Sequence, residues 1–171
     1  MVWLDAAVWV SVDSVHWFRV ADRTGQLGGK GEQGLFDVVQ FGTGMVAGGF
    51  ATGPEGIDGA LWRSADGVSW SRVLAQADLG GSGDQKITRL TTAIPGFKLA
   101  VGGLDTSSGD ADADVWTTID GSTIRREVIL GGSGNQSIQS VAVSGGLVVA
   151  VGYDSFNGNL DAAIWTSELG E

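Results

Sequence analysis

The chain has 171 residues, of which 29 are glycine and 43% are hydrophobic. This composition excludes a disordered chain, which lacks apolar surface to bury, and a helical bundle, which so much glycine would destabilise. The sequence has no cysteine, which excludes disulfides and thiolate chemistry, and its net charge of −10 disfavours binding to nucleic acid or to an anionic membrane, because both attract cationic surfaces.

No apolar run approaches the roughly 18 residues of a membrane-spanning helix. The first ten residues contain Asp5 and no basic residue, so we expect no signal peptide in the given chain. A leader removed before this numbering would leave no trace, and the cellular compartment stays open.

A five-residue string recurs four times along the chain. It reads DAAVW, DGALW, DADVW and DAAIW, and it ends at Trp9, Trp62, Trp116 and Trp165, which are 53, 54 and 49 positions apart. A second string lies between these copies and reads GGKGEQ, GGSGDQ or GGSGNQ. Two independent markers with one period predict a repeat architecture.

We expect a single repeat domain over residues 1–171. Its repeats are residues 1–34 (half a blade), 35–85, 86–136 and 137–171 (a partial blade). Glycine turns and short apolar runs predict four strands in the third repeat, at residues 87–93, 97–104, 112–119 and 122–130.

Four antiparallel strands in about 50 residues are typical of one β-propeller blade. Counting two, four, four and three strands in the successive repeats gives thirteen, which is three blades and one surplus strand. The sequence therefore predicts an all-β fold, a β-propeller of four-stranded antiparallel blades, with about three blades per chain.

A polar hairpin follows the tryptophan of each repeat and is clearest in residues 64–70, SADGVSW. Asp66 is expected to accept hydrogen bonds from backbone N–H groups two residues on, and Gly67 to adopt a positive φ. The pattern resembles the Asp-box repeat of bacterial sialidase-type propellers, with one residue fewer before the glycine. The resemblance covers nearly the whole chain and implies a fold more than an activity. We interpret the repeated aromatic and acidic residues as structural: Trp9, Trp62, Trp116, Trp165, Trp17, Trp70, Asp13, Asp66 and Asp120.

Three blades do not close a ring, because closed propellers have about 4–8 blades. An open arc would expose two apolar faces. We therefore expect a homodimer that forms one six-bladed ring, in which the partner's first hairpin, residues 5–20, completes the last repeat. The alternative is that the chain is an excerpt from a longer propeller.

The long loops at residues 51–57, 105–111 and 154–160 are predicted to share one face with the GGxGxQ strings. Function concentrates on such loops, so this face is the candidate surface for a protein or carbohydrate ligand. We interpret the GGxGxQ strings themselves as blade-to-blade turns, whose Gln amide bonds neighbouring backbone, in preference to an anion-binding nest.

An acidic loop in the third repeat is a candidate binding site for Ca²⁺. Its carboxylates at alternate positions are weak candidate ligands, because hard oxygen donors suit Ca²⁺. The loop lacks the glycine and the terminal glutamate of an EF-hand loop, so we favour a solvated acidic loop and expect no cofactor. The four candidates are Asp105, Asp110, Asp112 and Asp114.

The sialidase-type resemblance also implies which residues a catalytic chain would need. These are an arginine cluster, a Tyr nucleophile paired with Glu, and an acidic Asp. In a propeller the first strand of each blade lines the central channel. Three residues occupy matching positions in these strands: Asp37, Arg89 and Ser140. Only one of the three is an arginine, and one arginine per three blades does not make a cluster. We therefore expect a non-enzymatic binding or assembly scaffold with no catalytic residue. The alternative is a sialidase-like glycoside hydrolase or its inactive relative. The candidate ligand contacts are Asp37, Arg89, Ser140, Tyr153 and Phe156.

Overall fold

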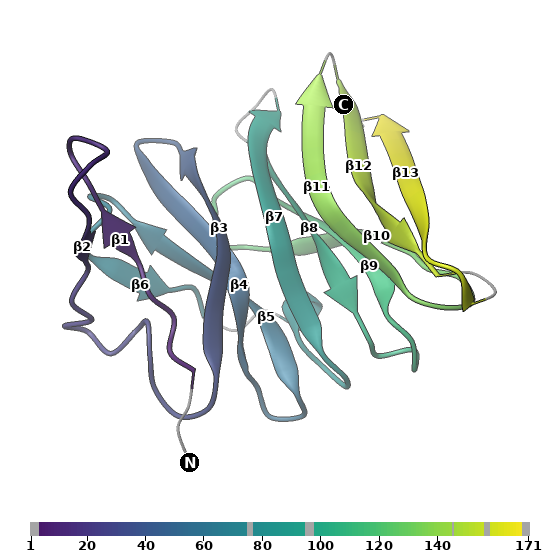
Figure 1. Ribbon diagram of the computed structural model, residues 1–171, viewed down its shortest axis with the longest axis horizontal. Coiled ribbons are helices and arrows are strands. Elements are labelled where there is room, and N and C mark those ends of the chain that lie inside the picture. The colour runs from purple at the N-terminus through teal and green to yellow at the C-terminus, as the bar shows by residue number, and fades with distance from the viewer. Residues whose placement is uncertain (1–3, 75–76, 95–97, 145, 156–157, 169–171) are drawn as a thin grey trace.

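The computed structural model describes residues 4–74, 77–94, 98–144, 146–155 and 158–168 (Figure 1). Within these residues the chain forms four antiparallel sheets and one short 3-10 helix, η1 (Ala77–Leu79). The strands, in chain order, are β1 (Trp9–Val10), β2 (Phe18–Arg19), β3 (Gln33–Phe41), β4 (Gly44–Thr52), β5 (Ile57–Ser64), β6 (Trp70–Arg72), β7 (Gln85–Ile94), β8 (Lys98–Asp105), β9 (Asp112–Thr118), β10 (Arg125–Leu130), β11 (Gln136–Ser144), β12 (Leu147–Asp154) and β13 (Asp161–Glu168).

Consecutive strands pair in every sheet, in the orders β1-β2, β3-β4-β5-β6, β7-β8-β9-β10 and β11-β12-β13. This grouping of two, four, four and three strands confirms the all-β blades that the sequence predicts. The fourth strand of the third blade begins at Arg125 and not at residue 122, because residues 120–123 form a turn. The predicted turn at residues 95–96 lies outside the described residues.

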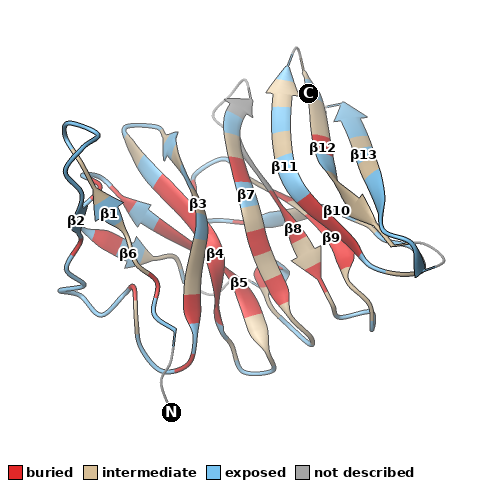
Figure 2. Ribbon diagram, viewed as in Figure 1, coloured by how far each residue is buried: buried red, intermediate tan, exposed pale blue. Residues whose placement is uncertain are grey.

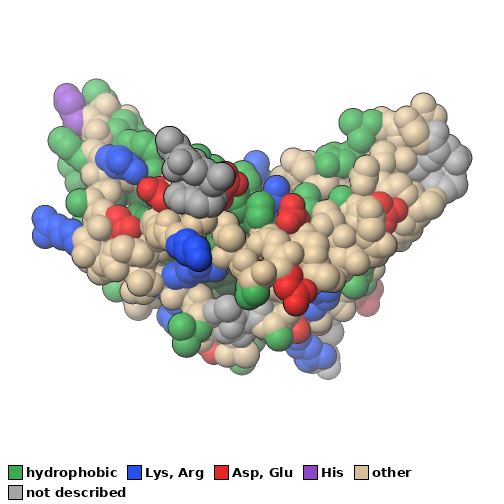
Figure 3. All heavy atoms as spheres, turned by 90° about the horizontal axis from the view of Figure 1, so that it is seen from below, with side chains coloured by type: hydrophobic (Ala, Val, Ile, Leu, Met, Phe, Trp, Pro, Cys, Tyr) green, Lys and Arg blue, Asp and Glu red, His purple; other side chains and the backbone are tan. Residues whose placement is uncertain are grey.

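The four sheets stand side by side and form an open, V-shaped arc (Figures 1 and 3). The first strands β3, β7 and β11 lie next to one another along its concave side. Side chains link these strands: Oδ2 of Asp37 accepts a hydrogen bond from the Leu90 amide at 2.9 Å, and Thr88 Oγ1 donates to the Ile138 carbonyl at 2.6 Å.

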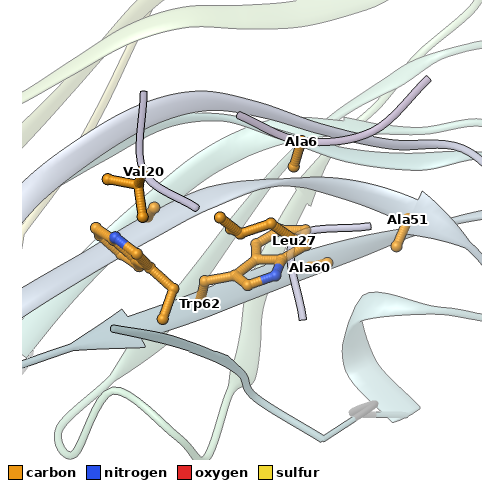
Figure 4. Packing of buried hydrophobic residues seen from close by; sticks show 8 residues of the cluster. Ala6, Val20, Leu27, Ala51, Ala60 and Trp62 are labelled. Atoms are coloured by element: carbon orange, nitrogen blue, oxygen red, sulfur yellow. The ribbon is translucent and has the colours of Figure 1, made fainter. Parts of the chain in front are cut away.

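The hydrophobic core is divided among the spaces between neighbouring blades, as the buried bands of Figure 2 show. Trp62 is fully buried between the first and second blades, where it packs against Val20 and Leu27 (Figure 4). Trp116 is buried in the same way between the second and third blades. Each indole Nε1 donates to a backbone carbonyl of the preceding connection, Gln26 for Trp62 and Asp78 for Trp116.

Trp70 in β6 is buried as well, whereas the other three repeated tryptophans are less covered. Trp9 and Trp17, in the first sheet and its hairpin, are exposed, and Trp165 in β13 is half-buried. Burial therefore follows the completeness of the sheet that carries the indole, because the enclosed tryptophans lie in the two four-stranded sheets and the others in the two- and three-stranded ones.

The hairpins between third and fourth strands contain the predicted turns. In the second blade, Asp66 Oδ1 accepts hydrogen bonds from the Val68 and Ser69 amides at 2.8 and 2.6 Å, and Gly67 has a φ of 75°. Asp120 makes the same bonds in the third blade and Asp13 in the first, where His16 Nδ1 lies 2.7 Å from Asp13 Oδ2. The hydrogen bonds that the sequence predicts for these aspartates are thus present.

Candidate functional site

On one face of the arc, hydrogen bonds join the connections between blades to the loops between second and third strands. In the third blade the Asp84 amide donates to Thr106 Oγ1 at 2.7 Å, and the Thr106 amide donates to the Asp84 carbonyl at 2.9 Å. Asn135 and Ser155 make the same pair of bonds in the last blade, at 2.7 and 2.8 Å. We call the surface built from these loops the loop face.

The fifth residue of the repeated GGxGxQ string also reaches back to the preceding blade. Asp84 Oδ1 accepts a hydrogen bond from the amide of Ile57, where β5 begins, and Asn135 Oδ1 accepts one from the Ala111 amide, just before β9. Each connection therefore ties two blades together. These hydrogen bonds hold the described parts of the loop face in place, because several of their backbone amides and carbonyls have partners within the protein.

The glutamine that ends the GGxGxQ string is buried in all three copies. Its Nε2 donates to the backbone carbonyl three residues earlier: Gln33 to Lys30, Gln85 to Ser82 and Gln136 to Ser133. These bonds confirm the interpretation of the string as a blade-to-blade turn.

A buried group of charges lies at the loop-face end of the third blade. Arg126 in β10 donates through Nη2 to Asp105 Oδ2 at 2.7 Å, and its Nε lies 3.1 Å from Asp114 Oδ2 in β9. Neither oxygen of Asp114 has an aligned hydrogen-bond donor in the described protein. The contact with Arg126 is therefore an ion pair without a well-formed hydrogen bond.

The pKa values of the two carboxylates in this group are shifted in opposite directions. Burial raises the pKa of Asp114 to about 7, against the attraction of Arg126 and with the help of the nearby charges of Asp105 and Asp112. Burial also favours a higher pKa for Asp105, but hydrogen bonds from Gln85 and Ser107 and the charge of Arg126 outweigh it and lower the pKa of Asp105. The pair therefore holds one firmly ionised carboxylate and one that titrates near neutral pH.

A cavity of about 280 Å³ opens beside Arg126 on the loop face. Its walls combine a guanidinium, an amide, carboxylates and hydroxyls, a set that can both donate to and accept from a polar ligand. The side chains that line it are Asp78, Ser82, Gln85, Asp105, Ser107 and Arg126.

Arg126 did not enter the sequence-based site, although a signal for it exists. Arg19, Arg72 and Arg126 each lie ten residues after a repeated tryptophan, and Arg72 and Arg126 stack on the rings of Trp62 and Trp116. That spacing places an arginine beside each tryptophan across the hairpin.

Among the described residues, Arg126 is the arginine of this repeat position that forms ion pairs with two carboxylates. The positions of Asp105 and Asp114 are occupied in the second blade by Ala51 and Ala60, as the strand registers show. The charged group is therefore a property of this blade and not of the repeat.

The four aspartates weighed as Ca²⁺ ligands each have a protein partner. Asp105 and Asp114 face Arg126, Asp110 Oδ2 accepts from the Gly134 amide, and Asp112 Oδ2 accepts from Ser108 Oγ. Across the described ranges, no group of three or more acidic or histidine side chains is arranged to hold a metal ion.

Asp37, Arg89 and Ser140 occupy equivalent places, each directly after a bulge in its first strand. Arg89 and Ser140 are exposed. The carboxylate of Asp37 accepts hydrogen bonds from the amides of Val38 and Leu90 at 2.8 and 2.9 Å, so this side chain joins two blades.

The other two sequence-predicted ligand contacts do not belong to this set of equivalent positions. Tyr153 is half-buried in the second strand of the last blade, opposite Ser137, and Phe156 lies outside the described residues. In the part of the chain that the structure describes, no hydrogen bond or ion pair joins Tyr153 to Arg89. No helix there has the length and apolarity needed to cross a bilayer.

Antiparallel sheets standing side by side, with their first strands along a common concave side, define the chain as a β-propeller fold. Its structure is similar to that of a mutant of the Bombyx mori GH32 β-fructofuranosidase in complex with sucrose, with a TM-score of 0.55 and 15% sequence identity. The match covers 95% of this chain and 39% of that protein. No family model and no curated protein matches the sequence. The likeness confirms the propeller fold that the Asp-box resemblance implies and does not extend to membership of an Asp-box family.

Proposed function

We propose that the chain is a non-enzymatic β-propeller scaffold that binds a protein or carbohydrate ligand through its loop face. The proposal rests on the hydrogen bonds that hold these loops in place, in which Asp84 is bonded to both Thr106 and Ile57. A surface held in one shape loses little conformational entropy when a ligand binds, and this favours recognition.

A neutral carbohydrate is the ligand class to test first. The structural neighbour is described in complex with sucrose, and the net charge of −10 disfavours anionic ligands. The 280 Å³ cavity offers hydroxyl, amide and guanidinium groups, which suit sugar hydroxyls because these both donate and accept hydrogen bonds.

The test is a glycan array that includes sucrose and neutral oligosaccharides, followed by calorimetry on each hit. Ser82→Trp fills the mouth of the cavity and is expected to weaken binding at least tenfold. Ser71→Trp is the matched control, because Ser71 is exposed in β6 and lines a different depression, with Gly42 and Thr43. Binding that is equal in the two variants, or no binding to any glycan or to a protein partner, contradicts the proposal.

The second candidate function is a glycoside hydrolase or its inactive relative, favoured by the GH32 likeness of the fold. Its test is turnover of sucrose and of fluorogenic glycosides, with Tyr153→Phe as the variant that removes the phenolic hydroxyl. The scaffold proposal predicts no turnover above the buffer rate. Turnover that Tyr153→Phe abolishes would establish the hydrolase instead.

A further inference from the structure

The last blade ends at a strand with one unpaired side. β13 pairs with β12 along its whole length, and among the described residues it has no second neighbouring strand. The equivalent strands β5 and β9 pair on both sides. We call the side of β13 that faces away from β12, at the end of the arc, the open edge (Figure 1). Every second residue of β13 directs its backbone N–H and C=O groups toward this edge.

The open edge lacks the features by which proteins protect a strand edge from further pairing. The residues between Asp161 and Glu168, AAIWTS, include no charge and no proline. The ladder between β12 and β13 runs without a bulge. Protected edges usually carry such a residue or a bulge, or lie under a covering segment. The open edge is therefore suited to pairing with an added strand.

The fourth strands of the other blades show which side chain fits beside the repeated tryptophan. In each case the residue directly opposite the tryptophan is an arginine: Arg19 opposite Trp9, Arg72 opposite Trp62 and Arg126 opposite Trp116. The guanidinium carbons of Arg72 and Arg126 lie 5.8 and 5.7 Å from the ring centroids that they face, within the range of a cation–π interaction. Within the described residues, no arginine stands opposite Trp165.

Two further positions of the fourth strands are alike. A valine follows each arginine, directly or after one bulged residue, and pairs with the residue before the tryptophan: Val20 with Val8, Val73 with Leu61 and Val128 with Val115. A large apolar residue stands two positions before each arginine: Trp17, Trp70 and Ile124. The common pattern is therefore a large apolar residue, any residue, arginine and valine.

The open edge presents the matching half of these contacts. Trp165 and Ile164 occupy the places of Trp62 and Leu61 in their sheet. Trp165 is half-buried and Ile164 is 71% exposed, so both have surface left for an added strand to cover. The carboxylates at the two ends of β13 are exposed and favour a cationic segment.

The last repeat departs from the others at the hairpin that elsewhere leads to the fourth strand. Three aspartates accept the backbone hydrogen bonds of that hairpin: Asp13, Asp66 and Asp120. Each lies four positions after the repeated tryptophan, and the sequence has Leu169 four positions after Trp165. A leucine side chain offers no oxygen to accept these bonds. This difference favours a fourth strand supplied by another molecule.

We propose that the open edge of β13 binds an extended peptide segment of a partner protein by strand addition, and that it selects a large apolar residue, any residue, arginine and valine. The segment pairs with β13 as an antiparallel fourth strand, its arginine stacks on Trp165 and its valine covers Ile164. The inference goes beyond the proposed binding function, because the open edge includes neither the cavity beside Arg126 nor the loops that Asp84 joins.

The first test uses a synthetic peptide with the sequence of residues 67–74, GVSWSRVL, which contains this pattern. Its binding to the whole wild-type chain is measured by calorimetry. In the peptide, Arg72→Gln is expected to weaken binding about fivefold, because the cation–π interaction is lost. Ser71→Gln is the matched control at the unselective position and is expected to bind like the original peptide. Trp165→Leu in the protein is expected to remove most of the difference between the two peptides.

Thr166→Pro in the protein locates the binding edge. Ile164 is the equivalent of Leu61, whose carbonyl accepts a hydrogen bond from the Val73 amide of the fourth strand. Thr166, two residues on, therefore directs its N–H to the open edge, where a proline is tolerated. The variant is expected to bind the peptide about tenfold more weakly, because one ladder hydrogen bond is lost and its acceptor is left unpaired. Thr166→Val keeps the N–H and is the matched control, and far-ultraviolet dichroism checks that both variants fold.

The outcomes decide as follows. No binding to the wild-type chain, equal binding of the Arg72→Gln and Ser71→Gln peptides, or undiminished binding by Thr166→Pro each overturns the proposal. The peptide comparison decides alone if Thr166→Pro does not fold. Light scattering that gives the wild-type chain twice its 17.6 kDa, and Thr166→Pro the single mass, would show that a second copy occupies the edge and would also overturn the proposal. Glycan binding by Thr166→Pro reports separately on the proposed function.

Discussion

Asp112 lies so close to Gly131 that a Cβ added to the glycine would come within 2.8 Å of the Asp112 Cγ. Asp58 and Gly80 have the same relationship one blade earlier, at 2.9 Å. In both pairs the aspartate opens a string that ends in tryptophan, and the glycine is the first residue of a GGxGxQ string. The two sequence markers therefore meet in space, where the third strand of a blade packs on the connection to the next.

Gly131→Ala tests this contact, because the added methyl group has no room beside the Asp112 carboxylate. Overpacking of this kind costs about 1–3 kcal/mol in the free energy of unfolding, measured by urea denaturation. Gly132→Ala is the matched control, since its nearest neighbour is Gln136 Nε2 at 3.8 Å, and little change is expected there. Equal midpoints for the two variants would contradict the contact.

Trp62→Ala tests the division of the core among the spaces between blades. Removing this buried indole leaves a cavity and costs about 3–5 kcal/mol in the free energy of unfolding. Trp165→Ala, at the equivalent half-buried position, is expected to cost clearly less. Thermal and urea unfolding of the two variants give the comparison, and equal losses would show that the indoles contribute in the same way wherever they lie in the arc.

The turns at Asp13, Asp66 and Asp120 predict a loss of stability in acid. Hydrogen bonds from the Ser69 and Val68 amides hold the pKa of Asp66 well below its usual range. Amide hydrogen bonds lower the pKa of Asp120 in the same way, and for Asp13 the hydrogen bond with the His16 side chain is the largest cause, followed by backbone amides. A carboxyl group with a lowered folded-state pKa stabilises the fold above its unfolded pKa, about 3.9, and loses that contribution as the pH falls further.

The measurement for these turns is the melting temperature between pH 6 and pH 2. Asp66→Asn removes one ionised acceptor while keeping an oxygen at the same place, so its melting temperature is expected to fall less steeply on acidification than that of the wild-type chain. Parallel curves for the two proteins would mean that the turn carboxylate does not contribute to the acid sensitivity.

The sequence predicts the strands and turns that recur in every repeat, but it does not predict side-chain groups that occur in a single blade. Period and turn chemistry are local, so the strands and the bonds of Asp66 and Gln85 follow from residue spacing. The meeting of Asp105, Asp114 and Arg126 depends on the register of three strands, which spacing alone does not give.

Side-chain direction is the second limit on prediction from the sequence. The sequence predicts that Asp37 and Arg89 occupy matching positions in their first strands, and both lie directly after a bulge, which the sequence does not predict. The sequence does not reveal that the carboxylate of Asp37 turns toward the Leu90 amide. Repeat position fixes where a residue lies on a blade, while its partners depend on how the blades pack.

Asp114 predicts a second pH dependence, of opposite sign to that of the turns. Burial raises the pKa of Asp114 to about 7, so between about pH 4 and pH 7 the folded state binds a proton that the unfolded state has released. The contribution is complete below the unfolded pKa and is lost as the pH rises through 7. Each pKa unit corresponds to about 1.4 kcal/mol, so the free energy of unfolding is expected to fall by a few kcal/mol across this range.

Asp114→Asn removes the titrating group and keeps its shape, and it is expected to abolish this decline, as measured by urea unfolding at intervals from about pH 4 to about pH 8. Asp114→Ala restores the residue type of the second blade, Ala60, and is expected to flatten the profile in the same way. Asp105→Asn is the informative comparison, because a lowered pKa leaves Asp105 ionised throughout this range. If the decline persists in Asp114→Asn, the group that titrates near neutral pH is not Asp114, and the ion pair with Arg126 keeps both partners charged.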